Sequence, residues 1–235
     1  MDTYRRNAIA VGILFIACSA ASILSAAPLG SALDSSDYLQ ALAGRDGQVV
    51  LAAVIEFIWA ATAAGIAIGL YPVLRRHGRA LALGSVVGRT AEGVLVLVAT
   101  VCLLMLLTLS QQQAALGAAA DSASQVLGDT LLSARDWIHG FVMLLPWLVG
   151  AFLYYWVLLR SRLIPRWLSV WGLAAIVLSA GATLYAGFAQ DFGFTSLNTA
   201  LNAPIGLQEI VLGVWLIAKG FSPPGVASSR AMPAA

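Results

Sequence analysis

Six long apolar runs separated by short polar segments constrain this 235-residue chain more than any other feature of its sequence. Crossing a hydrocarbon core of about 30 Å takes roughly 20 helical residues. We expect spanning helices near residues 8–29, 48–72, 81–109, 137–159, 167–189 and 204–219. Pro146 is expected to kink the fourth helix, and Pro204 to begin the sixth, because a proline lacks the N–H that stays unpaired in a first helical turn. The pattern predicts an all-α, polytopic transmembrane bundle.

Composition supports a membrane protein and argues against other classes. Of the residues, 60% are hydrophobic and 10% are charged, whereas an ordinary soluble domain has roughly 25% charged residues. The net charge of +2 comes with no basic face, so nucleic-acid binding is not expected. Cys18 and Cys102 lie inside apolar runs, where a thiol behaves as a small hydrophobe, so neither a disulfide nor a metal site is expected. The cofactor stays unknown.

The distribution of basic residues predicts the orientation, because cytoplasmic loops of membrane proteins are enriched in Lys and Arg. If the six runs span, ten basic residues fall on one side and two, Arg45 and Arg135, on the other. The ten are Arg5, Arg6, Arg75, Arg76, Arg79, Arg160, Arg162, Arg166, Lys219 and Arg230. We therefore expect both termini in the cytoplasm.

Two alternative interpretations affect the helix assignment. Residues 1–27 are basic, then apolar, then end in small residues, which is also the order of a cleaved signal peptide, although the apolar run is longer than usual. The third span could instead begin at Gly93, leaving Arg89 and Glu92 at the cytoplasmic surface, although residues 93–109 would barely cross a bilayer.

Two further segments are expected to lie outside the spans. Residues 111–133 are rich in Ala, Ser and Gln with weakly amphipathic spacing, and we expect a helix on the outer membrane interface. Residues 222–235, which contain two prolines followed by Gly, Ser and Ala, are expected to form a disordered cytoplasmic tail. Residues 1–221 are then a single transmembrane domain.

The acidic residues are partitioned in an informative way. All three glutamates, Glu56, Glu92 and Glu209, fall inside expected spans, whereas every aspartate is expected in a loop or terminal segment. A charge near the bilayer centre costs at least about 2.5–3.5 kcal/mol, so it faces the bundle interior and finds a partner or is neutralised. Three such groups predict a polar interior.

Arg89 and Glu92 are three residues apart, which places them on one helical face as a possible ion pair. If the faces carrying Glu56, Glu209 and His139 converge with this pair, they line a cavity that opens outward. The candidate catalytic residues are Glu92, Glu209 and Glu56. The candidate ligand-binding residues are Glu56, Arg89, Glu92, His139, Glu209, Gln208, Trp59 and Trp147, with Asp136, Thr90, Thr62 and Tyr185 as supporting residues.

Each of these residues also has a plain structural interpretation. Arg89 and the glutamates could form a clamp that fixes helix register. His139 could bind water or a lipid headgroup, and Trp59 and Trp147 could be core packing instead of pocket walls. A metal site is not expected, because the glutamates lack the E-x-x-H spacing of di-metal bundles.

Short motifs resemble those of an uncharacterised bacterial membrane family, domain of unknown function 4386. They are the run Arg160–Ser169 at the turn between the fourth and fifth spans, Arg89 and Glu92, and Glu209 followed by Trp215, Leu216, Lys219 and Gly220. The likeness covers roughly residues 4–221. It implies a six-span fold in a bacterial inner membrane, and it brings no activity, substrate or cofactor.

Three classes of function are compatible with these features. The first is a non-enzymatic protein that binds a small or lipid-like ligand in an outward-facing polar cavity, or that serves as an accessory subunit of a membrane protein partner. The second is a membrane-embedded enzyme in which a glutamate acts as general acid on a prenyl or lipid substrate. The third is an ion or proton transporter, although few polar residues lie on the cytoplasmic side of Arg89.

Overall fold

The computed structural model describes residues 3–116, 122–193 and 195–222, and these fold into an all-α bundle. The main helices are α1 (Thr3–Leu24), α3 (Asp46–Leu74), α4 (Arg79–Leu116), α5 (Ser122–Trp137), α6 (Leu144–Ser161), α7 (Arg166–Ala189) and α8 (Ser196–Ala218). The short elements are η1 (Ala32–Asp34), α2 (Tyr38–Leu42) and the π-helical turn η3 (Ile138–Val142).

Six helices of the described chain are long and apolar enough to cross a membrane, as the apolar runs predict. They are Tyr4–Leu24, Asp46–Leu74, Arg79–Ala115, Ala123–Ser161, Arg166–Ala189 and Ser196–Ala218. Many large apolar side chains on their outer surfaces are exposed, among them Phe188 at 89% and Val177 at 67%. Such a surface suits lipid and not water, so the protein is a multi-pass membrane protein.

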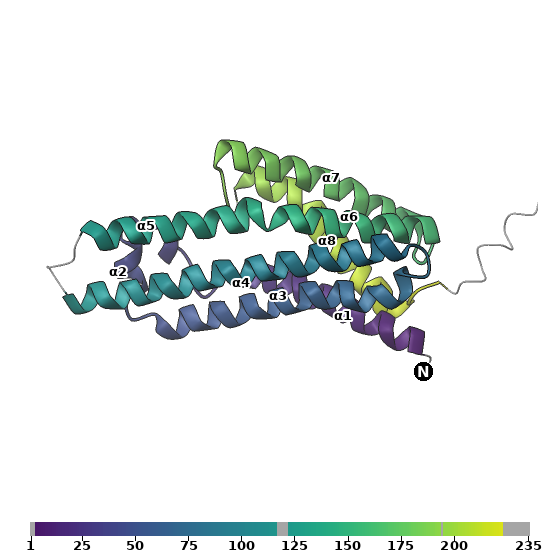
Figure 1. Ribbon diagram of the computed structural model, residues 1–235, viewed down its shortest axis with the longest axis horizontal. Helices are drawn as coiled ribbons and strands as arrows, with labels where there is room; N and C mark the ends of the chain where they lie inside the picture. Colours follow the sequence, from purple (N-terminus) through teal and green to yellow (C-terminus); the bar gives the residue numbers. More distant parts are fainter. Residues whose placement is uncertain (1–2, 117–121, 194, 223–235) are drawn as a thin grey trace, which may run out of the picture.

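The helices differ in how far they extend along the bundle (Figure 1). At 38 residues, α4 is about 55 Å long, well beyond the roughly 30 Å hydrocarbon core. Figure 1 shows α1, α7 and α8 grouped toward one end of the long axis, and α2 and α5 toward the other. One end of α4 therefore extends past α1 together with α5.

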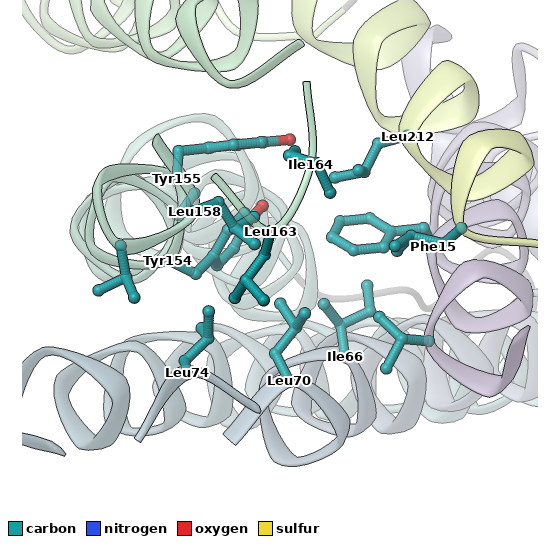
Figure 2. Packing of buried hydrophobic residues seen from close by; sticks show 14 of the residues in the cluster. Phe15, Ile66, Leu70, Leu74, Tyr154, Tyr155, Leu158, Leu163, Ile164 and Leu212 are labelled. Atoms are coloured by element: carbon teal, nitrogen blue, oxygen red, sulfur yellow. The ribbon is translucent and has the colours of Figure 1, made fainter. Parts of the chain in front are cut away.

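A large apolar core lies at the end of the bundle where α1, α7 and α8 are grouped. Figure 2 shows side chains from five parts of the chain pointing into this core. They are Phe15 of α1, Ile66, Leu70 and Leu74 of α3, Tyr154, Tyr155 and Leu158 of α6, Leu163 and Ile164 of the next turn, and Leu212 of α8. The turn in the Arg160–Ser169 motif is thus anchored by its two apolar residues.

Close backbone contacts also lock the helices at glycines. A Cβ atom built on Gly88 of α4 would lie 2.6 Å from the Pro146 carbonyl oxygen and 2.7 Å from the Cα of Gly150, both on α6. A Cβ on Gly12 of α1 would lie 2.6 Å from the carbonyl oxygen of Gly213 on α8. Small residues let membrane helices approach this closely, so dispersion contacts form along their backbones.

The fourth span differs from the expected range 137–159. It runs from Ala123 to Ser161, because α5 continues along the line of α6 through the π-helical turn (Figure 1). In that turn the Met143 N–H donates to the Ile138 carbonyl at 3.0 Å, which is an i to i−5 bond. Pro146 has no N–H to offer the preceding turn, and the wider turn just before it accommodates this gap.

Within the described ranges, residues 111–133 divide between two long helices instead of forming one separate helix. Residues 111–116 extend α4, and residues 122–133 belong to α5, which packs beside α4. The Tyr38 hydroxyl donates to the Asp129 carboxylate at 2.7 Å, and Leu131 and Leu132 pack on the apolar cluster that α2, α3 and α4 share. Burial and the nearby Asp129 carboxylate raise the pKa of the Tyr38 hydroxyl, so it stays a donor at neutral pH.

The remaining helix ends shift by smaller amounts, apart from the sixth. Pro204 does not begin the sixth spanning helix as expected. It lies inside α8, which begins eight residues earlier, at Ser196. The Thr195 side chain accepts a hydrogen bond from the Asn198 N–H and caps this helix, so its start is set by the cap and not by the proline. Of the expected tail at residues 222–235, only Ser222 is described, so that prediction lies outside the described residues.

Candidate functional site

The ion pair expected on α4 is present and buried. The Arg89 Nη1 atom lies 3.0 Å from Glu92 Oε2, and the two side chains are 1% and 3% exposed. Arg89 also points its Nε atom at the Ala63 carbonyl and its Nη2 atom at the Cys18 sulfur, each at 3.5 Å. Arg89 and Glu92 both lie within α4, which is one continuous helix from Arg79.

Glu209 of α8 faces the same interior from the opposite side. Its Oε2 atom accepts a hydrogen bond from the Ser19 hydroxyl at 3.2 Å. Its Oε1 atom is buried and has no hydrogen-bond partner among the described residues, and the side chain is only 8% exposed. A buried oxygen without a donor costs free energy, so its position calls for an explanation.

Arg89, Glu92 and Glu209 all line one cavity, with a volume of about 400 Å³. This volume falls within the range of small-molecule sites. Its polar lining is Arg89, Glu92, Glu209, Cys18, Ser19, Ser22, Asn198, Thr199 and Asn202. Its apolar and small lining residues are Ile23, Trp59, Met143, Leu144, Trp147, Gly193, Ala203, Ile205 and Gly206.

The charged residues of the lining are buried, whereas the exposed residues of the lining lie where the cavity meets the surface. Ile23, Thr199 and Ala203 are exposed, and they sit near the end of α1 and the first turns of α8. The cavity therefore leads from the surface, between α1 and α8, down to the carboxylates. The walls between are the indole rings of Trp59 and Trp147.

Glu56 lies outside the cavity lining, in a second charged cluster. Its carboxylate forms a two-atom ion pair with Arg135 of α5, in which Nη1 lies 3.3 Å from Oε2 and Nη2 contacts Oε1. The Thr100 hydroxyl donates to the same carboxylate at 2.6 Å, and Arg135 Nη1 also donates to the Ala99 carbonyl at 3.0 Å. Both carboxylate oxygens are therefore satisfied.

Arg135 is a buried charged residue that the sequence analysis does not include among the candidates. The expected fourth span begins at residue 137, which assigns this arginine to an outer loop together with Arg45. It is 6% exposed. A signal was present, because Glu56 inside a span requires a cationic partner and Arg135 stands two residues before an apolar run.

The other candidates divide between the cavity and its surroundings. Gln208 accepts from the Tyr155 hydroxyl and donates to the Leu168 carbonyl at 3.0 Å, so it joins α6, α7 and α8 outside the cavity lining. His139 is also outside the cavity lining, and its ring lies against Trp59 with the ring centroids 5.7 Å apart. Its Nε2 atom is buried and has no partner in the described part of the chain.

The supporting residues are not brought to the cavity. Asp136, Thr90 and Tyr185 are exposed, and the Thr62 hydroxyl donates to carbonyls of its own helix. Asp129 and Asp136 lie within α5, in contrast to the loop positions expected for aspartates. No group of three or more His, Cys, Asp or Glu side chains forms a candidate metal site within the described ranges.

Comparison with known proteins places the chain by sequence. The family model described as Domain of unknown function (DUF4386) matches residues 10–220, which is the family that the short motifs resemble. No curated protein and no solved structure matches the chain.

Proposed function

The chain belongs to the DUF4386 family, whose description assigns no activity, and we propose from its cavity that it binds a small or lipid-like ligand. The carrying observation is the Glu209 Oε1 atom, which is buried and unpartnered and belongs to a residue that lines a 400 Å³ cavity. A ligand that donates a hydrogen bond there would satisfy this oxygen.

We further propose that the protein lies in a bacterial inner membrane with both termini in the cytoplasm, so that the cavity opens outward. The support is the distribution of charge. Arg5, Arg75, Arg160 and Lys219 are grouped where α1, α3, α6 and α8 have their cytoplasmic ends in this orientation. The exposed cavity residues near the end of α1 lie at the opposite end of that helix.

The proposal is tested by native mass spectrometry of the gently solubilised protein, with extraction of whatever is retained. We expect a retained small molecule that is lost from the Glu209→Gln and Glu92→Gln variants. A filled cavity gives an independent test, because a Cβ on Gly206 meets no atom within 4 Å and the residue lines the cavity. Gly206→Phe should therefore expel the ligand without disturbing the helices.

Gly181→Phe is the matched control. It too lies in a helix with nothing within 4 Å of its Cβ, but it is exposed and does not line the cavity. Equal retention of the ligand in both phenylalanine variants would refute the cavity as the binding site. A co-purifying protein that survives in Gly206→Phe would instead favour an accessory subunit.

A further inference from the structure

We propose that the ligand of this cavity is an organic cation, an ammonium group carried on an apolar body. This inference rests on the function proposed above and narrows it to one chemical class. Three features of the cavity support it: the net charge of its buried residues, the hydrogen-bond donors and acceptors of its lining, and its two tryptophan side chains.

The charges of the buried lining residues do not cancel. One guanidinium, that of Arg89, faces the carboxylates of Glu92 and Glu209. The other two buried charged residues of the described chain, Glu56 and Arg135, neutralise each other in their own cluster. If both cavity carboxylates are ionised, one negative charge is left without a partner, and in a poorly solvated site either a bound proton or a monovalent cation must balance it. A cationic ligand that enters the cavity takes the place of that proton.

The hydrogen bonds of the lining point the same way. Ser19 donates its hydroxyl to Glu209, and Ser22 donates its hydroxyl to the Ser19 carbonyl at 2.9 Å. The side-chain amides of Asn198 and Asn202 donate to backbone carbonyls at 2.8 Å and 2.9 Å. These donors are spent within the protein, while Glu209 Oε1 stays available as an acceptor. The Tyr154 hydroxyl and Arg89 Nη1 are likewise buried without a hydrogen-bond partner in the described chain. A ligand ammonium would donate a charge-assisted hydrogen bond to Glu209 Oε1.

The apolar lining of the cavity suits the apolar body of such a ligand. Trp59 and Trp147 both line the cavity, together with Met143, Leu144 and Ile205. Indole faces attract cations, and the aliphatic residues receive an apolar body. The positive charge of Arg89 is already paired with Glu92, 3.0 Å away, and its other nitrogens point at the Ala63 carbonyl and Cys18, which disfavours an anion as the ligand.

Three probes of similar shape test the inference by equilibrium dialysis against the detergent-solubilised full chain at neutral pH. They are 2-phenylethylamine, which is a cation, 2-phenylethanol, which is neutral but still a donor, and 3-phenylpropanoate, which is an anion. Binding that persists in Gly206→Phe protein is subtracted as uptake by the micelle. We expect the amine to bind about tenfold or more tighter than the alcohol, and the anion not to bind.

The other possible results of the dialysis would refute the inference, and they bear differently on the proposed function. Equal affinity for the amine and the alcohol would refute the cation and leave a neutral-ligand cavity, so the proposed function would stand. Tightest binding of the anion would make Arg89 the anchor and would also refute the inference. If none of the three bound in a way that Gly206→Phe removes, the inference would fail, and retention of a native ligand would then decide the proposed function alone.

The role of Glu209 is tested in the same assay. Glu209→Gln should bring the amine and alcohol affinities close together, because it removes the uncompensated charge and keeps the shape. Its elution on size exclusion reports whether it folds. The wild-type preference among the three probes needs no variant, so a poorly folded Glu209→Gln protein would not remove the test.

Discussion

Breaking the pair between Glu56 and Arg135 should destabilise the bundle strongly, and removing both charges together should not. The two side chains are 0% and 7% exposed. Removing one partner of a buried ion pair leaves an uncompensated charge and costs about 3–5 kcal/mol, whereas replacing both with apolar groups is often close to neutral. For a chain of this size about 1 kcal/mol corresponds to roughly 2–4 °C in Tm.

Glu56→Leu and Arg135→Met should each therefore lower the Tm by about 6–20 °C. The double variant should recover most of this loss. Thr100 stays satisfied in it, because its hydroxyl also donates to the Val96 carbonyl at 2.9 Å. Thermal unfolding in one fixed detergent, followed by tryptophan fluorescence, measures all three.

Asp46→Asn is the control for this cycle. Asp46 accepts a hydrogen bond from Gln111 at 2.8 Å but is exposed, so its replacement should change the Tm by no more than about 2 °C. Single variants that unfold at the parent's temperature would refute the reasoning. A double variant no more stable than the worse single variant would refute it equally, because the cost would then lie in packing and not in charge.

Three further predictions concern helix packing, helix capping and the orientation in the membrane. Gly88→Leu should prevent stable assembly, seen as aggregation on size exclusion, because α4 and α6 touch through the backbone at Gly88 and Gly150; a normal elution profile would contradict this. Thr195→Ala should cost about 1 kcal/mol through loss of the cap of α8, measurable as a small drop in Tm, with Thr195→Ser retaining the parent value. In intact cells, a membrane-impermeant maleimide should label Asp37→Cys and not Arg76→Cys, and the reverse pattern would overturn the proposed orientation.

Sequence reasoning succeeded where the physical cause is local. Hydropathy over about 20 residues depends on the segment alone, so six helices were predictable. The Arg89–Glu92 pair was predictable for the same reason, since its spacing places both residues on one helical face. The burial of Glu56 followed from its lying inside an apolar run.

It fell short where the cause is tertiary. Arg135 lies 79 residues from Glu56, and no local pattern joins them. Residues 111–116 and 122–133 gave too weak an apolar signal to reveal that they belong to α4 and α5, because Leu131 and Leu132 pack on a cluster that α2, α3 and α4 supply. Cys18 appeared as a small hydrophobe, and only the approach of α1 to α4 places its sulfur against Arg89.

The two charged clusters separate two roles that the sequence left together. A buried charge can fix how helices pack, or it can bind a ligand. Whether its hydrogen bonds are already satisfied within the protein distinguishes these two roles. Around Glu56, one arginine and one threonine satisfy both oxygens, so this cluster is complete and has no need of a ligand. Around Glu209, Oε2 accepts from Ser19, whereas Oε1 has no hydrogen-bond partner in the described chain. The clamp interpretation therefore fits Glu56 and Arg135, and the binding interpretation fits Glu209 with the Arg89–Glu92 pair.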